Sequence, residues 1–383
     1  MRILVVGGMG IIGGAITEAA CKKGHDVYIL SRRNITDYYK KLGAKGIQGD
    51  WKNDDFLISI VNEDFDVIVD TLVVKKEELI RDTRLVDGHC SHFIYISTDA
   101  VYMHPDENVS EERNIKLDDL KWTYGRNKRE AELYLFDEGD NYSFNWTIVR
   151  PTMTFGEKRI PVGFGSRKNE WTLVNRIINN KPVLNYDGLF PHAMCHTSTF
   201  GDAVVELFGN ESVYGECYHI SDDKTVVYRD IYNIIGSIVN KSPVVIEGDL
   251  NILKMLHYGK YVEMNYDKIP GFTLNNDKIK EVAPSANYDV DIKKAVYEEI
   301  EYLKNNYSST QEDLEYNILT DAILLLYRNS RNDYENMDKI DSYISSLPKD
   351  YIRILKLYIF KSRIKAVLRP LYKMLRKAIG IIR

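Results

Sequence analysis

Tyr124 and Lys128 are the residues whose types and spacing most clearly could do chemistry. They lie in the run YGRNKREAELYLF, which has the composition of a helix, and a spacing of four residues places both side chains on one helix face. An ammonium beside a phenol stabilises the phenolate and lowers a pKa that is ~10 in free tyrosine. Tyr124 is therefore a candidate general acid/base. The chain has 27 tyrosines, so chance pairs are expected, and a surface contact is the alternative interpretation.

A glycine-rich turn at the start of the chain predicts an anion site. Residues 2–6 (RILVV) are apolar and strand-like, and GGMGIIGG follows directly, before a helical stretch. Backbone N–H groups and the helix dipole favour negative charge at such a turn. In a dinucleotide site, Gly7 would permit the turn, Gly10 would let a pyrophosphate approach, and Gly13 would allow close helix packing. The spacing is G-x-x-G-x-x-G rather than G-x-G-x-x-G, and an ordinary βα turn is the alternative.

The second predicted strand, 25–31, ends in Ser31 and is followed by Arg32. The residue that closes this strand in a dinucleotide fold meets the adenosine ribose, where an acid favours NAD and an arginine accommodates the 2′-phosphate of NADP. We therefore expect NADP rather than NAD, unless Arg32 is simply solvated. Asp50, after a third short strand, is expected either near the adenine or at the start of the next helix.

Further apolar strands at 66–72, 92–97 and 145–151 alternate with helical stretches. This alternation predicts βαβ units with right-handed crossovers and hence a parallel sheet. The fifth strand runs into Ser97 and Thr98, so these hydroxyls are expected at the carboxyl edge of the sheet, over the cofactor crevice. The fold class is predicted to be α/β, a doubly wound parallel sheet of the Rossmann type.

The order of these motifs resembles the extended short-chain dehydrogenase/reductases, the NAD(P)-dependent epimerase/dehydratase group, over residues 1–300. The resemblance implies that Thr98 orients a substrate oxygen, Tyr124 transfers the proton, and Lys128 holds the nicotinamide ribose. It also implies a nucleotide-linked sugar as substrate, with a homodimer as the assembly. The cofactor contacts that it implies are Gly7, Gly10, Ile11, Ile12, Gly13, Ser31, Arg32, Asp50, Trp51, Leu72, Ser97, Tyr124, Lys128 and Pro151.

Three departures from the pattern of this group bear on the substrate. Ala100 stands where the sugar dehydratases carry a glutamate after Thr98-Asp99, so 4,6-dehydration is not expected, whereas reduction, oxidation and epimerisation remain open. Met103 follows Tyr102, where the pattern has a glycine. No arginine stands shortly before His196, in the stretch LFPHAMCHTST, so Arg176, Arg167 or Lys168 would have to grip the diphosphate. The substrate contacts implied are Asp99, Ala100, Arg176 and His196, with a purely structural histidine as the alternative for His196.

The stretch 187–221 also resembles the atypical CSP41-like branch of the superfamily, some of whose members bind RNA. That branch often loses the active-site tyrosine or lysine, whereas both Tyr124 and Lys128 are present here. We therefore expect retained redox chemistry. A binding protein without redox activity, for RNA, for a partner or for sensing NADP, is the alternative function.

Charge is unevenly distributed along the chain. The net charge is −5 for 383 residues, but from Lys349 onward eleven Lys/Arg stand against one acid, a net of +10. The remainder then carries −15. A negative body lacks the basic surface that nucleic-acid binding requires, which argues against this function for the body of the protein. The basic tail alternates with apolar residues, so it is expected either to lie on an anionic membrane surface or to pack on its own body or a partner.

The predicted regions are a Rossmann core at 1–155, an interleaved substrate-binding region at 156–306, and a helical extension at 307–383. The four cysteines are scattered without metal-ligand spacing, so no metal site is expected and free thiols are favoured. No apolar run reaches the ~18 residues of a membrane span. A cytoplasmic location is expected, with contact at the inner face of the membrane as an option for the tail.

Overall fold

The computed structural model describes residues 1–383 apart from 103–105, 114, 157, 187–189, 331–335 and 379–383. The chain forms two compact units, each assembled from three segments of the sequence. Unit 1 contains residues 1–161, 191–226 and 271–295, and unit 2 contains residues 162–190, 227–270 and 296–383. The segments interleave, so the chain passes between the units more than once.

Unit 1 is built on a seven-stranded sheet in which every neighbouring pair of strands is parallel, in the order β11-β7-β5-β4-β1-β2-β3. This arrangement confirms the predicted doubly wound α/β fold. The strands are β1 (Arg2–Val6), β2 (Asp26–Ser31), β3 (Lys45–Gln48), β4 (Phe65–Asp70), β5 (Cys90–Ile96), β7 (Asn145–Pro151) and β11 (Glu216–Ile220).

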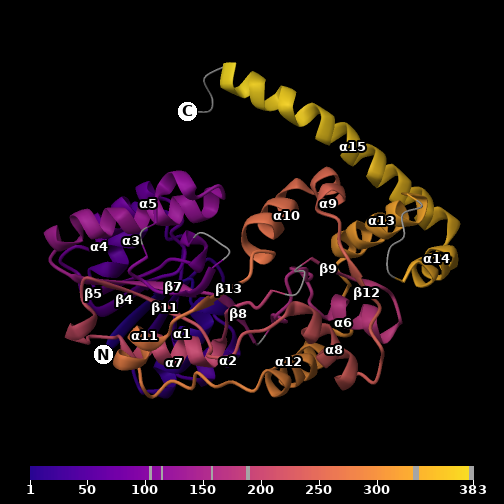
Figure 1. The fold of residues 1–383 in the computed structure, drawn as a ribbon. Helices are drawn as coiled ribbons and strands as arrows, with labels where there is room; N and C mark the ends of the chain where they lie inside the picture. Colours follow the sequence, from indigo (N-terminus) through magenta and orange to yellow (C-terminus); the bar gives the residue numbers. More distant parts are fainter. Residues whose placement is uncertain (103–105, 114, 157, 187–189, 331–335, 379–383) are drawn as a thin grey trace. The chain divides into compact units, whose positions relative to one another are not determined.

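Alternate residues of each strand face two separate hydrophobic cores, because side chains alternate across a pleated sheet. Ile3 and Val5 of β1 join the core formed with α1 (Ile11–Lys22) and α7 (Thr197–Glu206). Leu4 and Val6 join the core on the other face, formed with α3 (Asp54–Val61), α4 (Lys76–Val86) and α5 (Thr123–Glu138). Figure 1 shows these two groups of helices on opposite faces of the sheet. Burial on both faces explains why the strands read as continuous apolar runs.

The strand order places a topological switch at β1. The chain moves outward from β1 to β2 and β3 on one side, then returns to β4, which pairs with β1 on its other side. Ligands of open α/β sheets bind outside the carboxyl ends of the strands at such a point. The loops after β1 and β4, which begin at Gly7 and Thr71 respectively, therefore border the expected dinucleotide crevice.

Three shorter strand pairs complete the description. In unit 1, β8 (Met153–Phe155) pairs with β10 (Met194–His196), and β6 (Asp106–Val109) pairs with β13 (Phe272–Leu274). In unit 2, β9 (Val183–Asn185) pairs with β12 (Val245–Glu247). The remaining helices are α2 (Asp37–Lys41), α6 (Trp171–Ile178), α8 (Tyr228–Ile238), α9 (Leu250–Leu256), α10 (Tyr258–Glu263), α11 (Asp277–Val282), α12 (Ile292–Tyr307), α13 (Leu314–Ser330), α14 (Met337–Ser346) and α15 (Lys349–Ala378).

The helices after residue 307 belong to unit 2 rather than to a region of their own. Asp313 caps the start of α13 by accepting from the Glu315 and Tyr316 amides, and its other oxygen accepts from the Ser166 hydroxyl at 2.9 Å. Arg176 of α6 donates to Asp321 of α13 at 2.7 Å. These buried polar contacts join segments more than 140 positions apart in the sequence, so α13 is an integral part of unit 2.

Candidate functional site

The glycine turn has the geometry expected of a phosphate cradle. Gly7 adopts a positive φ of 78°, and a Cβ atom on Gly13 would lie 2.4 Å from the Gly7 carbonyl oxygen. Gly10 precedes α1, and a Cβ there would meet only the Gly7 carbonyl oxygen, at 3.5 Å. Gly7 and Gly13 are thus required by the turn and by helix packing, while the surface at Gly10 is open. Ile11 and Ile12 form the first turn of α1, partly buried.

Of the residues expected at the adenosine end, Ser31, Arg32 and Asp50 are exposed or half-buried, whereas Trp51 is buried. Ser31 ends β2, its Oγ accepts from the Arg33 amide at 3.2 Å, and Arg32 is exposed beside it. Asp50 is exposed, and its Oδ1 accepts from the Lys52 amide at 3.1 Å. The Trp51 side chain lies in the hydrophobic core, and its indole N–H donates to Asp82. The Trp51 ring is therefore occupied in packing rather than in reaching a cofactor.

A close backbone contact brings the hydroxyl loop to the start of α5. A Cβ atom on Gly125 would lie 2.2 Å from the Ala100 carbonyl oxygen, so only glycine allows this approach. Thr98 begins the short 3₁₀ turn Asp99–Val101, and its Oγ1 accepts from the Ala100 amide and donates to Asp99 at 3.1 Å. The loop with Thr98 and the helix with Tyr124 are thus neighbours. Sequence reasoning did not single out Gly125, although its position directly after Tyr124 was a usable signal.

Lys128 lies at the carboxyl edge of the sheet, between two strands. Its Nζ donates to the carbonyls of Val73, in the loop after β4, and Ile96, at the end of β5, at 2.6 and 2.7 Å. The ammonium also lies over the ring of Tyr95, 4.9 Å from its centroid. Burial lowers the pKa of Lys128 to about 8, although the negative charges of Asp70, Glu132 and Glu78 act to raise it. The group is therefore a cation near neutral pH that can release its proton under mildly basic conditions.

The remaining predicted cofactor contacts surround this edge. Leu72 is exposed in the loop after β4, and a Cβ on Gly7 would approach its side chain within 2.8 Å. Ser97 is buried, and its amide donates to the Val149 carbonyl at 2.7 Å. Pro151 is the last residue of β7. All three lie in loops or strand ends at the carboxyl edge, on the side of the sheet where the glycine turn also lies.

A buried ion pair holds α5 on the sheet. Glu132 lies one turn after Lys128 on α5 and accepts two hydrogen bonds from Arg150 of β7, at 2.8 and 2.9 Å. Arg150 also donates to the Tyr102 hydroxyl, which contacts His219 Nδ1 at 2.9 Å. Burial acts to raise the pKa of Glu132, but the Arg150 charge and hydrogen bonds dominate and lower it. Since 124, 128 and 132 share one helix face, this ion pair orients the face that carries Tyr124 and Lys128.

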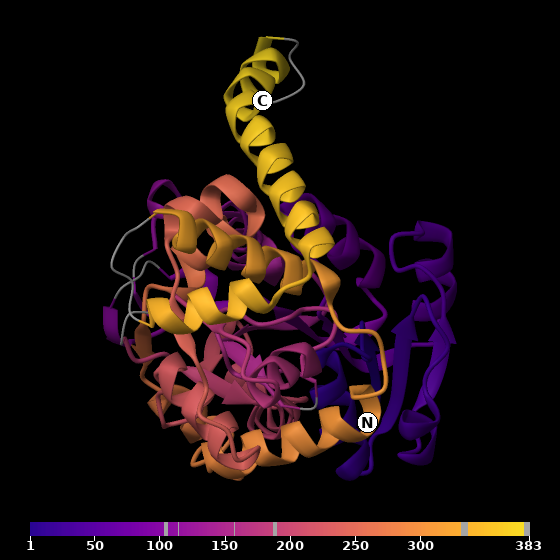
Figure 2. The same ribbon diagram turned by 90° about the vertical axis from the view of Figure 1, so that its right-hand side faces the viewer.

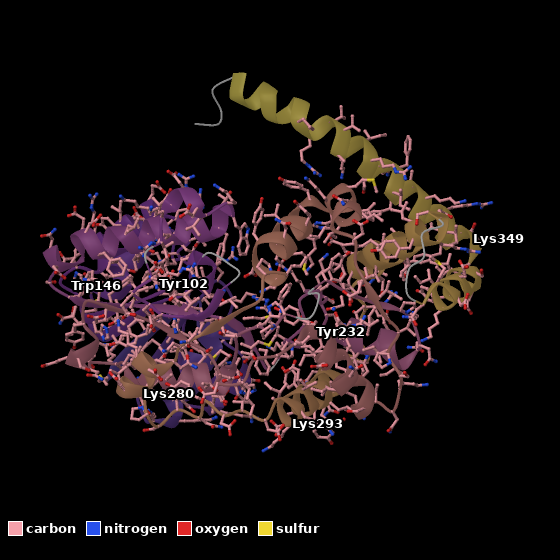
Figure 3. All side chains as sticks on the ribbon, viewed as in Figure 1. Tyr102, Trp146, Tyr232, Lys280, Lys293 and Lys349 are labelled. Carbon is pink, nitrogen blue, oxygen red and sulfur yellow. The ribbon has the colours of Figure 1, made fainter. Side chains whose placement is uncertain are left out.

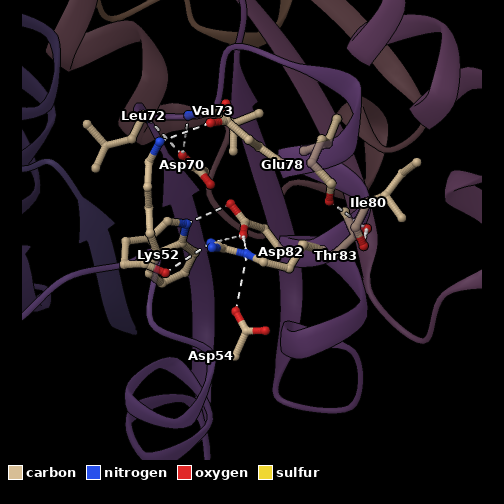
Figure 4. A network of polar contacts seen from close by, with 12 residues as sticks. Lys52, Asp54, Asp70, Leu72, Val73, Glu78, Ile80, Asp82 and Thr83 are labelled. Atoms are coloured by element: carbon tan, nitrogen blue, oxygen red, sulfur yellow. Dashed lines mark hydrogen bonds and ion pairs between the residues drawn. The ribbon is translucent and has the colours of Figure 1, made fainter. Parts of the chain in front are cut away.

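Asp70 and Asp82 form a buried carboxyl pair behind the loop after β4 (Figure 4). Asp70 Oδ1 accepts from the Leu72 and Val73 amides at 2.8 and 3.2 Å, while Asp82 accepts from the Trp51 indole at 2.6 Å and from Arg81. Burial, followed by the charge of Asp70 and its hydrogen bond, raises the pKa of Asp82 to about 8. Near neutral pH the Asp82 carboxyl is therefore protonated, because burial beside the charge of Asp70 disfavours its ionised form.

Two residues predicted to contact the substrate make hydrogen bonds within the protein. Arg176 is buried in unit 2, where its guanidinium donates to the Pro182 carbonyl, to Asn317 and to Asp321. The prediction that Arg176 grips a diphosphate is therefore wrong, because its nitrogens are engaged within unit 2. His196 caps α7, its Nδ1 lying 2.7 Å from Ser198 Oγ, which favours the structural alternative for this residue.

Arg167 and Lys168 are also committed to partners in unit 2. Arg167 pairs with Glu263, and Lys168 pairs with Glu315 at 2.9 Å. Both cations are exposed, so their pairs are weak in water. Asp99 and Ala100, by contrast, remain in the loop beside α5 and are both buried.

The described residues contain neither a metal-type cluster nor a spanning helix. No group of three or more His, Cys, Asp or Glu within the described ranges could hold a metal ion. No helix in that part of the chain is long and apolar enough to cross a membrane. The four cysteines are free thiols.

The chain belongs to the NmrA-like family, whose model matches residues 1–307. It is 30% identical over 230 residues to an uncharacterised protein of Schizosaccharomyces pombe, covering 55% of this chain and 58% of that protein. It is 26% identical over 243 residues to the chloroplast stem-loop binding protein of 41 kDa b of Arabidopsis thaliana, covering 59% and 60%. The chain thus spans about three fifths of the length of these two relatives.

Longer but weaker similarity extends to nucleotide-sugar enzymes. The CDP-paratose 2-epimerase of Salmonella typhi is 20% identical over 317 residues, covering 70% of this chain and 88% of that enzyme. The structure of UDP-glucuronic acid 4-epimerase from Bacillus cereus in complex with NAD superposes with a TM-score of 0.63 at 17% identity, covering 82% of this chain and all of that one. These likenesses confirm the resemblance to the extended short-chain dehydrogenase/reductases and to their CSP41-like branch.

The glycine turn leads to a paired prediction. Gly13→Ala should destabilise the protein by roughly 1–3 kcal/mol, because its Cβ has no space. Gly10→Ala should cost less than about 1 kcal/mol, since only open space faces it, yet it should weaken dinucleotide binding by obstructing a phosphate. Thermal unfolding and titration with NADPH measure the two effects. Equal destabilisation by both substitutions, or undiminished NADPH binding by Gly10→Ala, would contradict the proposed cradle.

The carboxyl pair leads to a prediction about pH. Because the pKa of Asp82 is about 8 in the folded protein and 3.8 ordinarily, the unfolded chain loses this proton first, and stability falls as pH rises from about 4 to 8. Asp82→Asn should therefore flatten the decline in melting temperature over that range. Asp54→Asn, which alters an exposed carboxylate near Arg81, is the control and should leave the decline unchanged. If the melting temperatures of Asp82→Asn and the wild type fell equally over this pH range, the raised pKa of Asp82 would be contradicted.

Proposed function

We propose that this protein is an NAD(P)-dependent oxidoreductase or epimerase that acts on a nucleotide-linked sugar. The observation that carries the proposal is the placement of Lys128, one helical turn from Tyr124, at the carboxyl edge of β4 and β5, next to the switch point where the glycine turn lies. Membership of the NmrA-like family and similarity to the CDP-paratose 2-epimerase support it.

The residues at this edge fit a dinucleotide. The turn at Gly7 and Gly13 leaves no space for side chains, and the surface at Gly10 is open to a phosphate. In this proposal Gly7, Gly10 and the first turn of α1 hold the diphosphate, while Ser31 and Arg32 hold the adenosine end. Because Arg32 follows the strand and no acid stands there, NADP is the proposed cofactor and NAD the alternative. When bound, the nicotinamide would accept or supply hydride.

Each catalytic side chain has one task in the proposed reaction. The Tyr124 phenol takes a proton from, or returns it to, the substrate oxygen. Thr98 orients that oxygen through its hydroxyl. The Lys128 ammonium stabilises the phenolate electrostatically and would lie beside the nicotinamide ribose. Ala100 has no group that could remove a proton from carbon, so elimination of water is not part of this proposal.

Reduction or oxidation and epimerisation differ in the fate of the cofactor. An epimerase would retain a tightly bound cofactor that is not consumed, whereas a reductase would turn over NADPH stoichiometrically with substrate. Incubation with a panel of nucleotide sugars, read first by thermal shift and then by NADPH absorbance, distinguishes the two and identifies the sugar class.

A non-redox binding function is the second candidate. It is favoured by the similarity to a relative whose name describes stem-loop binding. It is disfavoured by charge, since the chain before Lys349 carries about −15. A filter-binding assay with an RNA stem-loop, compared between the wild type and Tyr124→Phe, tests it, because RNA binding would not depend on the phenol oxygen.

The location and the oligomeric state of the enzyme are also part of the proposal. We propose a cytoplasmic homodimer, with the basic C-terminal tail contacting the inner face of the membrane or a protein. Size-exclusion chromatography with light scattering tests the dimer.

Tyr124→Phe should lower kcat by roughly 10²–10⁴-fold, because the proton relay is lost. NADPH affinity should remain within about twofold, since the ring is retained. Tyr297→Phe, at an exposed tyrosine of α12, is the matched control and should leave kcat unchanged. Intact turnover by Tyr124→Phe on a substrate identified by the panel would remove the phenol from the mechanism.

Arg32→Ala should weaken NADPH binding by about 10–100-fold, because a hydrogen-bonded charge on the 2′-phosphate is worth roughly 1.5–3 kcal/mol. NADH binding should hardly change. Arg33→Ala, at the neighbouring exposed arginine, is the control. Equal losses for the two cofactors would refute the assignment of NADP, and fluorescence titration of the reduced nicotinamide measures both.

A further inference from the structure

The helix α15 has two faces with different surroundings. Leu355, Ile359 and Ser362 are buried, and this face packs on α9 and α13 within unit 2. The opposite face carries large apolar side chains that are exposed, at a spacing of three or four residues: Leu357, Phe360, Ile364, Val367 and Leu368. Figures 1 and 2 show α15 as a long helix that continues beyond α13, and in Figure 3 Lys349 marks its start. Intramolecular packing therefore accounts for only one of its two faces.

Cations border the exposed apolar stripe on both sides. At 100° per residue, Lys356 and Arg363 lie along one edge of the stripe, and Lys361 and Lys365 lie along the other; all four are exposed. Residues 349–370 contain seven Lys/Arg and one acid, Asp350. A helix with an apolar stripe between two basic edges has the pattern of one that lies in a membrane interface.

A basic pocket adjoins this face at the start of α15. It has a volume of about 620 Å³ and lies between α13, α14 and α15. Arg328, Lys349, Arg353 and Lys356 line it, with Leu325 and Ile344 among its apolar residues. Arg353 and Lys356 also lie beside the exposed stripe, so the pocket and the stripe form one continuous surface.

We propose that this surface, the α15 face, binds an anionic membrane. The apolar stripe would enter the boundary between headgroups and acyl chains, the flanking cations would contact anionic lipids, and the basic pocket would take a lipid phosphate. Lys and Arg side chains are attracted by the negative potential of an anionic surface, and burial of the apolar stripe adds to the affinity.

Charge distinguishes a membrane from a second copy of this chain as the occupant. Two α15 faces placed against each other would bring together seven cations from each helix with one acid from each, and like charges would repel across the contact. An anionic bilayer supplies the opposite charge over the whole length of the helix.

Vesicle sedimentation of the full chain tests the proposal. The wild type should pellet with vesicles of phosphatidylcholine and 30 mol% phosphatidylglycerol, at least about tenfold more tightly than with phosphatidylcholine alone. The triple variant Leu357→Glu/Phe360→Glu/Ile364→Glu should lose that binding, since it places acids on the exposed stripe. Glutamate is a good helix former, so the helix should persist.

The control is Ile58→Glu, which places a single glutamate at a similarly exposed isoleucine of α3, away from the α15 face, and it should pellet as the wild type does. Lys356→Ala/Lys361→Ala/Arg363→Ala should weaken binding to anionic vesicles only. Equal sedimentation of the wild type with neutral and anionic vesicles would overturn the proposal. So would full binding by the folded triple variant, or its conversion from dimer to monomer in light scattering, which would make the face an interface between copies.

Discussion

The hydrogen-bonded ion pair between Arg150 and Glu132 is the interaction on which the candidate site depends. Burying two charges away from water costs free energy. The cost is offset here because Arg150 makes two hydrogen bonds to Glu132. Arg129 also donates to Glu132, and Arg150 also donates to Tyr102. The pair fixes the position of α5 along its axis relative to β7. Glu132 and Lys128 are one turn apart, so the same contact determines where the lysine ammonium meets the strand carbonyls. Loss of either charge would leave the other buried and would release the helix that carries Tyr124.

The pKa of Lys128 results from opposing effects at the carboxyl edge of the sheet. Burial lowers the pKa of the lysine, but Asp70, Glu132 and Glu78 favour its charged form. Asp70 lies beside Asp82, whose raised pKa keeps its carboxyl neutral and so limits how much negative charge gathers near the lysine. A change in the protonation of this pair would therefore alter the charge that the lysine experiences. The site is in this sense a coupled set of ionisable groups rather than an isolated tyrosine and lysine.

In unit 2, the helices after residue 307 pack together with segments from earlier in the chain. Asp313, Arg176 and Asp321 connect α13 to α6 and to the segment around Ser166, and α15 packs on α13 with one face. The polar contacts require precise partners, whereas the exposed stripe of α15 requires only an apolar or amphiphilic surface. Internal packing explains the buried apolar residues of α15, and the proposed membrane contact would explain its exposed apolar and basic residues.

The amino-acid sequence alone determined the α/β class, the six strands β1, β2, β3, β4, β5 and β7, the glycine turn, and the placement of Tyr124 and Lys128 on one helix face. These features are local, because they follow from periodicity, turn chemistry and spacing within about 16 residues. The sequence also indicated a basic amphipathic tail. Tertiary structure alone decided that Arg176 is buried with Asp321 rather than free to bind a diphosphate, and that Trp51 belongs to the core. It alone brought Ala100 against Gly125, Asp70 against Asp82, and Arg150 against Glu132. Each of these contacts joins residues of different strands, helices or loops, and no local pattern specifies which partner on another element a charged or aromatic side chain will meet.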